Sequence, residues 1–247
     1  TIVMRVSNTG GSGADYVTGV NLIKSGSGNI SQVSGPTPQY ISLTAGAQHY
    51  ITWIYLATVA GDLSVSANAR GVDITLGNTI NSATTGSNVI TIESPAMLSA
   101  NLRAAPQQVS NGQIITVVMR VTNTGGADAL NVTGVTPTVS TGTGSVSLLT
   151  SPSPQTIPGG NNAIEFTWTY SATSSGTVQF TGMAYGYDEN SGLIKNSNAA
   201  TSNNVTIQIP AILTSSITAY PDPVGIAATI TVVMTVTNAG EATANNV

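Results

Sequence analysis

The acidic residues that recur in this chain belong to two Gly-x-Asp segments. Gly71–Asp73 and Gly186–Asp188 share the pattern, and the second continues as Asp188-Glu189-Asn190. Carboxylate and amide oxygens in a loop between strands suit Ca²⁺, which takes about six to eight oxygen ligands. Asp73 and Asp188 are therefore candidate calcium ligands. An Asp that begins a turn by accepting bonds from its own backbone explains the same pattern. Because only one carboxylate is shared, the turn is favoured, and we expect that no cofactor is required.

Side chains suited to catalysis are scarce. The single histidine, His49, aligns with Ile164 in the other copy of the sequence, so no histidine base recurs. Paired carboxylates at shared positions are absent as well. The sequence therefore predicts that the chain is not an enzyme.

The two tryptophans could bind a ligand, because a sugar can stack on a flat aromatic ring. Trp53 and Trp168 each fall in register with large apolar residues on a strand-like segment. Side chains in such a register are usually buried, so we expect both rings in the core.

The composition narrows the function further. Charged residues make up 6% of the 247-residue chain, and the net charge is −4. A nucleic-acid-binding surface needs clustered Lys and Arg, so we expect no nucleic-acid partner. No apolar run reaches the roughly 18 residues of a membrane-spanning helix, so we expect no transmembrane segment in these residues. Cys is absent, which excludes disulfides and thiolate chemistry.

The candidate residues described above lie in a sequence that contains an internal repeat. Thr116–Gly126 has the sequence TVVMRVTNTGG, and close copies occur at Thr1–Gly11 and Thr231–Glu241. The spacing is 115 residues in both intervals (119 − 4 and 234 − 119), as the methionines show: Met4, Met119 and Met234. Matched intervals of domain length indicate tandem copies of one module.

Each copy of this stretch alternates apolar and polar residues, which predicts a strand with one buried face. The expected inward residues are Met4 and Val6, Met119 and Val121, and Met234 and Val236. Seven short strand-like segments per repeat, separated by turn signals and without helical periodicity, predict an immunoglobulin-like β-sandwich. We therefore expect an all-β chain of tandem immunoglobulin-like seven-stranded repeats with a period of about 115 residues.

The phase of the repeat predicts three parts. Residues 1–95 form a repeat that lacks its first strand, residues 96–210 a complete repeat, and residues 211–247 the first two strands of a third. The chain is expected to be a window of a longer repetitive protein.

The segments VxNTGG, FTWTYSATSSGTVQFTG and SNAATSNNVTI resemble the CARDB-type repeats of bacterial and archaeal cell-surface proteins. The resemblance covers essentially the whole chain. It implies immunoglobulin-like modules related to cell adhesion in an exported protein at the cell surface or in a fibre. It implies no catalytic residues.

The low charge bears on assembly. Exposed edge strands are usually guarded by Lys, Pro or inward charges, but Lys and Arg total 6 here. We therefore expect a segment of an extracellular filament whose partners are other copies of the same protein, joined lengthwise and through strand edges. Strand donation between copies, or covalent continuity, would complete every sandwich. The alternatives are an adhesin stalk that binds a glycan or a protein and an accessory module of a secreted hydrolase.

Overall fold

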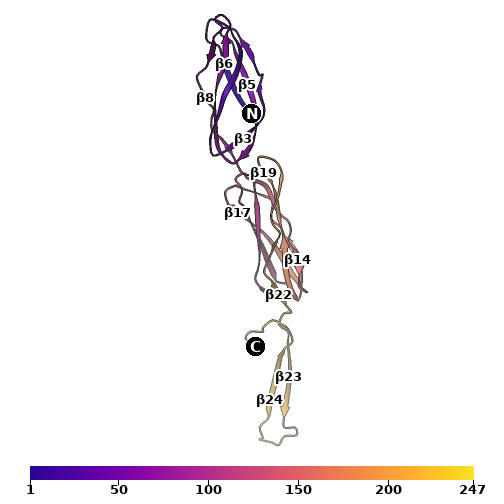
Figure 1. Cartoon of the computed structure of the whole chain (residues 1–247). Helices are drawn as coiled ribbons and strands as arrows, with labels where there is room; N and C mark the ends of the chain where they lie inside the picture. The colour runs from indigo at the N-terminus through magenta and orange to yellow at the C-terminus, as the bar shows by residue number, and fades with distance from the viewer. The chain divides into compact units, whose positions relative to one another are not determined.

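The computed structural model describes residues 1–247 and consists of strands and connecting loops without a helix. The chain divides into two compact units, Thr1–Ser94 and Pro95–Val247, which we describe one at a time (Figure 1). All strand pairs are antiparallel except β11 with β22. The prediction of an all-β chain is confirmed. No helix of the kind that crosses a membrane occurs.

Unit 1 holds two sheets. Its strands are β1 (Ile2–Ser7), β2 (Ala14–Gly26), β3 (Asn29–Thr37), β4 (Ile41–Leu43), β5 (Gln48–Val59), β6 (Gly61–Asp73), β7 (Thr79–Asn81), β8 (Thr85–Gly86) and β9 (Ile90–Ile92). One sheet has the order β1-β5-β3, so β1 is an edge strand. The other has the order β4-β2-β6-β7, and β8 and β9 also pair with β6.

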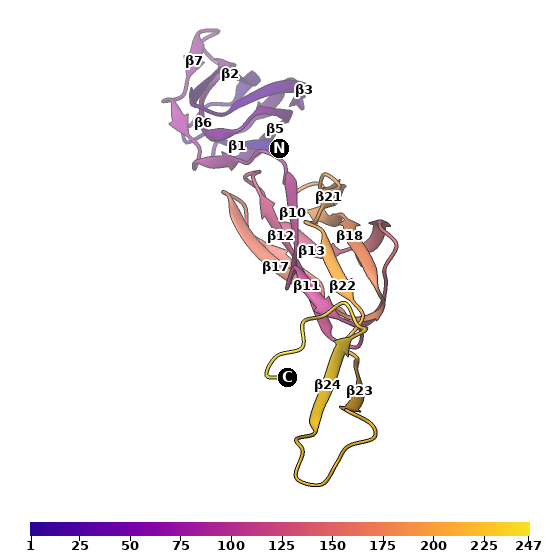
Figure 2. The same cartoon turned by 90° about the horizontal axis from the view of Figure 1, so that it is seen from below.

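Unit 2 begins with a strand that unit 1 does not have. Its strands are β10 (Leu98–Ala105), β11 (Gln108–Ser110), β12 (Ile114–Asn123), β13 (Ala129–Gly134), β14 (Thr138–Thr141), β15 (Ser145–Thr150), β16 (Gln155–Ile157), β17 (Asn162–Ser174), β18 (Gly176–Gly182), β19 (Ala184–Asp188), β20 (Ile194–Asn196), β21 (Ala200–Thr201), β22 (Val205–Gln208), β23 (Leu213–Tyr220) and β24 (Thr231–Asn238). The sheet β10-β12-β17-β15 has β10 at its edge, and β23 pairs only with β24. Figure 2 shows β10 running between the β12–β17 sheet and the strands β18 and β21.

The core of unit 2 follows the predicted alternation. Val117, Met119 and Val121 of β12 are fully buried. In β10 the burial alternates residue by residue, and Leu98 and Leu102 join the same core cluster. Strands of this kind form because β-branched and apolar residues at every second position place one continuous apolar face on the sheet.

The two tryptophans are core residues, as predicted. Trp53 is 4% exposed and Trp168 is 0% exposed. Each ring lies on a glycine: a Cβ at Gly19 would be 2.3 Å from Trp53 Cη2, and a Cβ at Gly134 would be 2.5 Å from Trp168 Cη2. The buried rings therefore form no sugar-stacking surface, and the glycines are needed for close packing rather than for a turn.

The expected burial is wrong in one place. Met234 and Val236 were predicted to point inward, but they are 62% and 42% exposed. The reason is that β23 and β24 form a two-stranded sheet on their own, with every residue of both strands exposed. Figure 1 shows the pair as two arrows without a facing sheet.

The tryptophan–glycine contact gives a stability test. Gly134→Ala should destabilise unit 2 by roughly 1–3 kcal/mol, because overpacking a filled core displaces the ring or the backbone. Gly19→Ala should act in the same way on unit 1. Gly86→Ala and Gly225→Ala are the controls, since a Cβ at either position meets nothing within 4 Å. Urea unfolding followed by tryptophan fluorescence measures the effect. Equal stability of all four variants would contradict the packing argument.

Candidate functional site

An asparagine at the end of β12 fixes the start of β10. Asn123 is fully buried, and its Nδ2 donates to Ala127 O at 2.8 Å and to Ile157 O at 3.1 Å. Its Oδ1 accepts from Gly125 N at 3.1 Å and from Met97 N at 3.0 Å. The amide thus uses both donors and both acceptor positions. One of these four bonds, from Met97 N, joins Asn123 to the segment that follows Pro95.

The equivalent asparagine of unit 1 has one bond fewer. Asn8 Nδ2 donates to Ser12 O at 2.8 Å and to Leu43 O at 3.1 Å, and its Oδ1 accepts from Gly10 N at 3.1 Å. No backbone N–H occupies the position that Met97 N has on Asn123. The acceptor of Asn8 on this side is therefore open.

Two serines in unit 2 fasten the segment that follows β20. Ser197 Oγ accepts from Ala184 N at 2.9 Å, and Ser202 Oγ accepts from Phe180 N at 3.0 Å. The backbone N–H of each serine donates back to the carbonyl of the same residue, at 2.8 Å in both cases. Each serine therefore makes two hydrogen bonds to one residue of the neighbouring strand, as a paired strand residue would. These bonds fix the position of the residue directly after the serine.

Those next residues are asparagines, and both bind β10. Asn198 Oδ1 accepts from Ala100 N at 2.9 Å, and Asn198 Nδ2 donates to Ala100 O at 3.0 Å. Asn203 makes the same pair of bonds with Ala104 N and O, both at 3.0 Å. The side-chain amides thus act as the neighbouring strand that the outer edge of β10 does not have.

The calcium candidate Asp188 completes this row. It is 2% exposed, and its Oδ2 accepts from Ala96 N at 2.6 Å. Its Oδ1 accepts from Ser191 N at 2.8 Å and from Ser191 Oγ at 2.7 Å. Burial would raise its pKa, but the hydrogen bonds from Ser191 and Ala96, together with the charge of Lys195, lower the pKa below its ordinary value. Asp188 therefore begins a turn and also binds the start of the first strand.

Asp73 begins a similar turn but binds no strand. Its Oδ1 accepts from Thr75 N at 2.8 Å, from Leu76 N at 3.0 Å and from Ser12 Oγ at 3.1 Å. The backbone bonds from Leu76 and Thr75 lower its pKa. Its Oδ2 has no hydrogen-bond partner. No three or more His, Cys, Asp and Glu side chains cluster around either aspartate. Calcium binding by Asp73 and Asp188 stays a prediction.

Unit 1 repeats the serine arrangement without the strand. Ser82 Oγ accepts from Ala69 N at 2.8 Å, and Ser87 Oγ accepts from Val65 N at 3.1 Å. The residue after Ser87 is Asn88, whose side chain makes only a bond from Nδ2 to its neighbour Val89. Unit 1 thus has counterparts of Ser197, Ser202 and Asn203 beside β1, but Ala83 stands at the position of Asn198.

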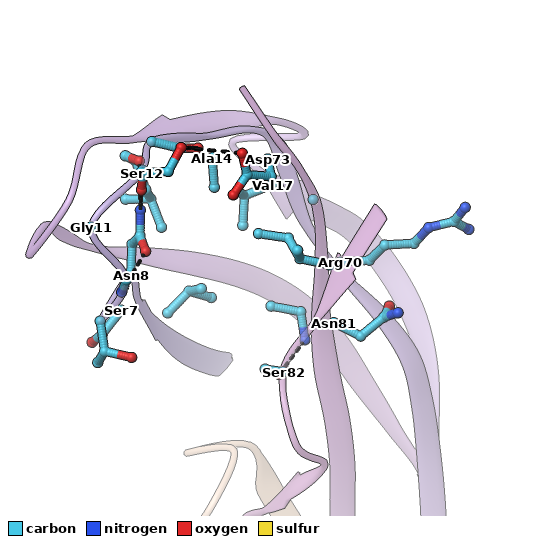
Figure 3. A pocket seen from close by; sticks show the side chains of 18 of the residues that line it. Ser7, Asn8, Gly11, Ser12, Ala14, Val17, Arg70, Asp73, Asn81 and Ser82 are labelled. Carbon is cyan, nitrogen blue, oxygen red and sulfur yellow. Dashed lines mark hydrogen bonds between the residues drawn. The ribbon is translucent and has the colours of Figure 1, made fainter. Parts of the chain in front are cut away.

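A groove follows the edge of β1. One part is a cavity of about 570 Å³ whose walls include Asn8, Ser12, Asp73 and Ala83 (Figure 3). Arg70 points away from it in the figure. A second part, next to Met4 and Trp53 among other residues, continues beside Ser87.

Side chains of unit 1 are more exposed than their counterparts in unit 2. Met4, which lines the groove, is 8% exposed where Met119 is 0% exposed, and Ile90, outside the groove, is 37% exposed where Val205 is 0% exposed. The core of unit 1 is also divided into two clusters, whereas unit 2 has one. The candidate functional site is therefore the groove along β1, bounded by apolar side chains and by the polar groups of Asn8 and Asp73.

Of the residues that make this site, sequence reasoning singled out Asp73, as a candidate calcium ligand, but not Asn8 or Ser87, nor the adjacent Asn88. The available signal is a Ser-Asn pair that occurs at Ser197-Asn198 and again at Ser202-Asn203, with Ser87-Asn88 matching the second pair at a spacing of 115 residues. His49, the one histidine, is exposed on β5 and takes no part in the groove. No protein-family model matches the sequence, and no curated protein is similar enough to count as a relative.

The asparagine bonds can be tested with a matched pair of variants. Asn203→Ala should destabilise unit 2 by about 1–3 kcal/mol, because it leaves the backbone N–H and C=O of the buried Ala104 without partners. Asn88→Ala should leave the stability of the dilute protein unchanged, because Asn88 holds no strand there. Amide exchange followed by mass spectrometry should show faster exchange in β10 for Asn203→Ala alone. Unchanged exchange in β10 would show that Asn203 does not hold the strand.

The lowered pKa of Asp188 predicts how the stability of unit 2 depends on pH. A carboxylate whose pKa is lower in the folded state stabilises that state above its unfolded pKa, and this contribution is lost as the pH falls through the folded value. Unit 2 should therefore lose stability on acidification below about pH 4, the region of an ordinary Asp pKa. In Asp188→Asn this part of the pH dependence should be smaller. Thermal unfolding between pH 2 and pH 6 measures it, and parallel curves for the two proteins would refute the assignment.

Proposed function

We propose that the chain is a structural repeat segment of an extracellular filament or cell-surface fibre, built from immunoglobulin-like β-sandwiches of the CARDB type with a period of about 115 residues. Its function in this proposal is mechanical continuity: force passes from one repeat to the next through the covalent chain and through contacts at each joint. Its partners are other copies of the same protein. Residues 211–247 are the first two strands of a third repeat.

The observation that carries the proposal is the joint between β22 and β23. Only residues 209–212 separate these strands. Ile209 N donates to Glu241 Oε2 at 2.8 Å, and Ile209 O accepts from Glu241 N at 3.0 Å and from Ala242 N at 2.9 Å. A Cβ at Gly240 would lie 2.0 Å from Pro210 O, so the turn and the joint are in close contact. A short connection held by hydrogen bonds transmits force, whereas a flexible linker would extend first.

Recurrence of contacts at the period of the sequence also supports the proposal. A Cβ at Gly125 would lie 2.1 Å from Pro95 O, which matches Gly240 and Pro210. Asn238 repeats three of the four contacts of Asn123: its Oδ1 accepts from Gly240 N and from Ile212 N, both at 3.0 Å, and its Nδ2 donates to Ala242 O at 2.8 Å. Repeats that preserve both their strands and their joints can be stacked without limit.

Cryo-electron microscopy of the native material, prepared with and without a chelator, tests the proposal. The expected result is a filament with density that continues from one 247-residue segment into the next. Separate particles with free ends would contradict the filament and favour an adhesin stalk. Loss of order on chelation, with density beside Asp188, would establish calcium as a structural ion, and unchanged order would leave the turn interpretation in its place.

A further inference from the structure

We propose that Tyr16 and Tyr40 form a carbohydrate-binding site on the outer face of the sheet β4-β2-β6-β7 in unit 1, and that its ligand is a neutral oligosaccharide. The inference goes beyond the structural function proposed above and does not depend on it, because the site lies within a single unit. It starts from an exposed tyrosine on a bulge of β2 and from a second tyrosine beside it.

The bulge of β2 presents the first ring. Ala14 pairs with Leu43 and Val17 with Ile41, so β2 has one more residue than β4 between these two pairs. Within the bulge, Tyr16 lies in the left-handed region with a φ of 52°. The residues that follow it at intervals of 115 positions (131 − 16 and 246 − 131) are Asn131 and Asn246, with φ of 50° and 58°. The bulge is therefore a property of the repeat and not of the residue that occupies it.

Tyrosine is a costly residue for this position. Asn tolerates the left-handed conformation, because its short side chain can bond locally, whereas a bulky residue there is strained. Core packing does not offset the strain, since Tyr16 is 69% exposed. Asn131 is exposed as well, in the unit that has its first strand, so exposure at this position does not depend on where the chain starts. A strained residue that contributes nothing to the core points to a binding role.

The second ring lies beside the first. Tyr40 comes directly before β4 and is 54% exposed. The centroids of the two rings are 6.2 Å apart, and the ring planes meet at 77°. In unit 2 the residue directly before β16, which pairs with the bulged strand as β4 does, is Pro154. The aromatic pair is thus specific to unit 1, although both units have the bulge that could carry it.

Polar side chains without partners lie near the rings. In β2 the buried residues on either side of the bulge are Ala14 and Val17, so Asp15 and Thr18 point outward with Tyr16. Thr18 faces Arg70 of β6, which is exposed and points away from the cavity in Figure 3. The side chains of Asp15 and Arg70 make no hydrogen bond or ion pair within the chain, and neither do the two tyrosine hydroxyls. Hydrogen-bond donors and acceptors are therefore available around the aromatic pair.

This combination of groups matches the chemistry of a sugar. A pyranose ring carries C–H groups on its face, which stack on the negative face of an aromatic ring. Its hydroxyls need both donors and acceptors at the rim, and Arg70 and Asp15 supply them. A neutral sugar suits the two charges together, whereas an acidic sugar would place a carboxylate near that of Asp15.

A protein partner fits the surroundings less well. A stable protein interface covers about 800 Å² on each side and has an apolar centre. The strand next to β2 is polar at most of its outward positions, among them Ser64, Ser66 and Arg70. The apolar surface at the site therefore consists mainly of the two rings, which is the size of a sugar-binding site.

Oligosaccharide binding to the 247-residue chain tests the proposal. Chitohexaose, cellohexaose and mannohexaose, all neutral, are titrated into the protein one at a time, and isothermal titration calorimetry measures the affinity. At least one of them should bind with a Kd below roughly 1 mM. Failure of all three to bind at that level would overturn the proposal.

Tyr16→Asn separates binding from folding, because it places the residue of unit 2 on the same bulge. The variant should bind the oligosaccharide at least tenfold more weakly, since it removes one of the two rings. Amide exchange in β2 and β4 should be no faster than in the unchanged chain, because Asn accepts the left-handed conformation without strain. Faster exchange in these strands with unchanged affinity would show that Tyr16 has a structural role only.

The matched control is an exposed tyrosine in the other sheet of unit 1. Tyr50 of β5 is 55% exposed and faces Arg5 of β1. Tyr40→Ala should weaken oligosaccharide binding at least tenfold, whereas Tyr50→Ala should bind as the unchanged chain does. Arg70→Ala should also weaken binding, with Arg5→Ala as its control. Equal affinity of the two tyrosine variants would refute the site.

A contact between proteins is the competing outcome, and sedimentation equilibrium detects it. An average mass that rises with concentration, but stays that of the monomer in Tyr16→Asn, would replace the sugar by a second copy of the chain if no oligosaccharide binds.

The outcomes also separate this inference from the filament. Oligosaccharide binding by a chain whose native material consists of separate particles would keep the site and remove the filament. Continuous filaments whose chains bind none of the three oligosaccharides would remove the site and leave the structural function standing.

Discussion

A strand at the edge of a sheet leaves every second backbone N–H and C=O without a strand partner, and β10 is such a strand. Side chains supply what a neighbouring strand would: Asp188, Asn198 and Asn203 bind the outward groups of Ala96, Ala100 and Ala104 in turn. Because the bonding side chains are short, they must be fixed within a few ångströms, and the two serine contacts fix them. The edge is thereby covered at these three positions without lysine or proline, the residues that sheet edges usually use.

The same polar groups recur in two other parts of the molecule. Unit 1 has the serines, Asn88 and the open oxygen of Asp73, but the strand that would use them is not seated there. The β23–β24 pair has the strand, but nothing covers its apolar face. Both parts keep the spacing of the arrangement in unit 2, except that Ala83 stands at the position of Asn198. Stability is therefore unequal along the chain, with unit 2 carrying the single continuous core.

Strand periodicity was predictable because it depends on local alternation. Val117, Met119 and Val121 are buried as their positions in the repeat indicated, and so are the tryptophans. The sequence could not show that Met234 would be exposed, since burial depends on a facing layer and not on the strand's own pattern. Nor did it reveal Asn198 and Asn203. In a chain rich in Ser, Thr and Asn, two more asparagines carry little signal until a backbone edge is seen beside them.

Because several strands are nearly identical, a strand could pair with the wrong partner while the chain folds. β10 finds suitable partners in both β1 and β12, and hydrogen bonding hardly distinguishes them. Connection length does: β12 starts 9 residues after β10 ends (114 − 105), whereas β1 ends 91 residues before β10 starts (98 − 7). Loop-closure entropy favours the nearer partner by about 2 kcal/mol. In a long array of such repeats, the short turn between the first two strands therefore keeps each repeat from capturing a strand of its neighbour during synthesis.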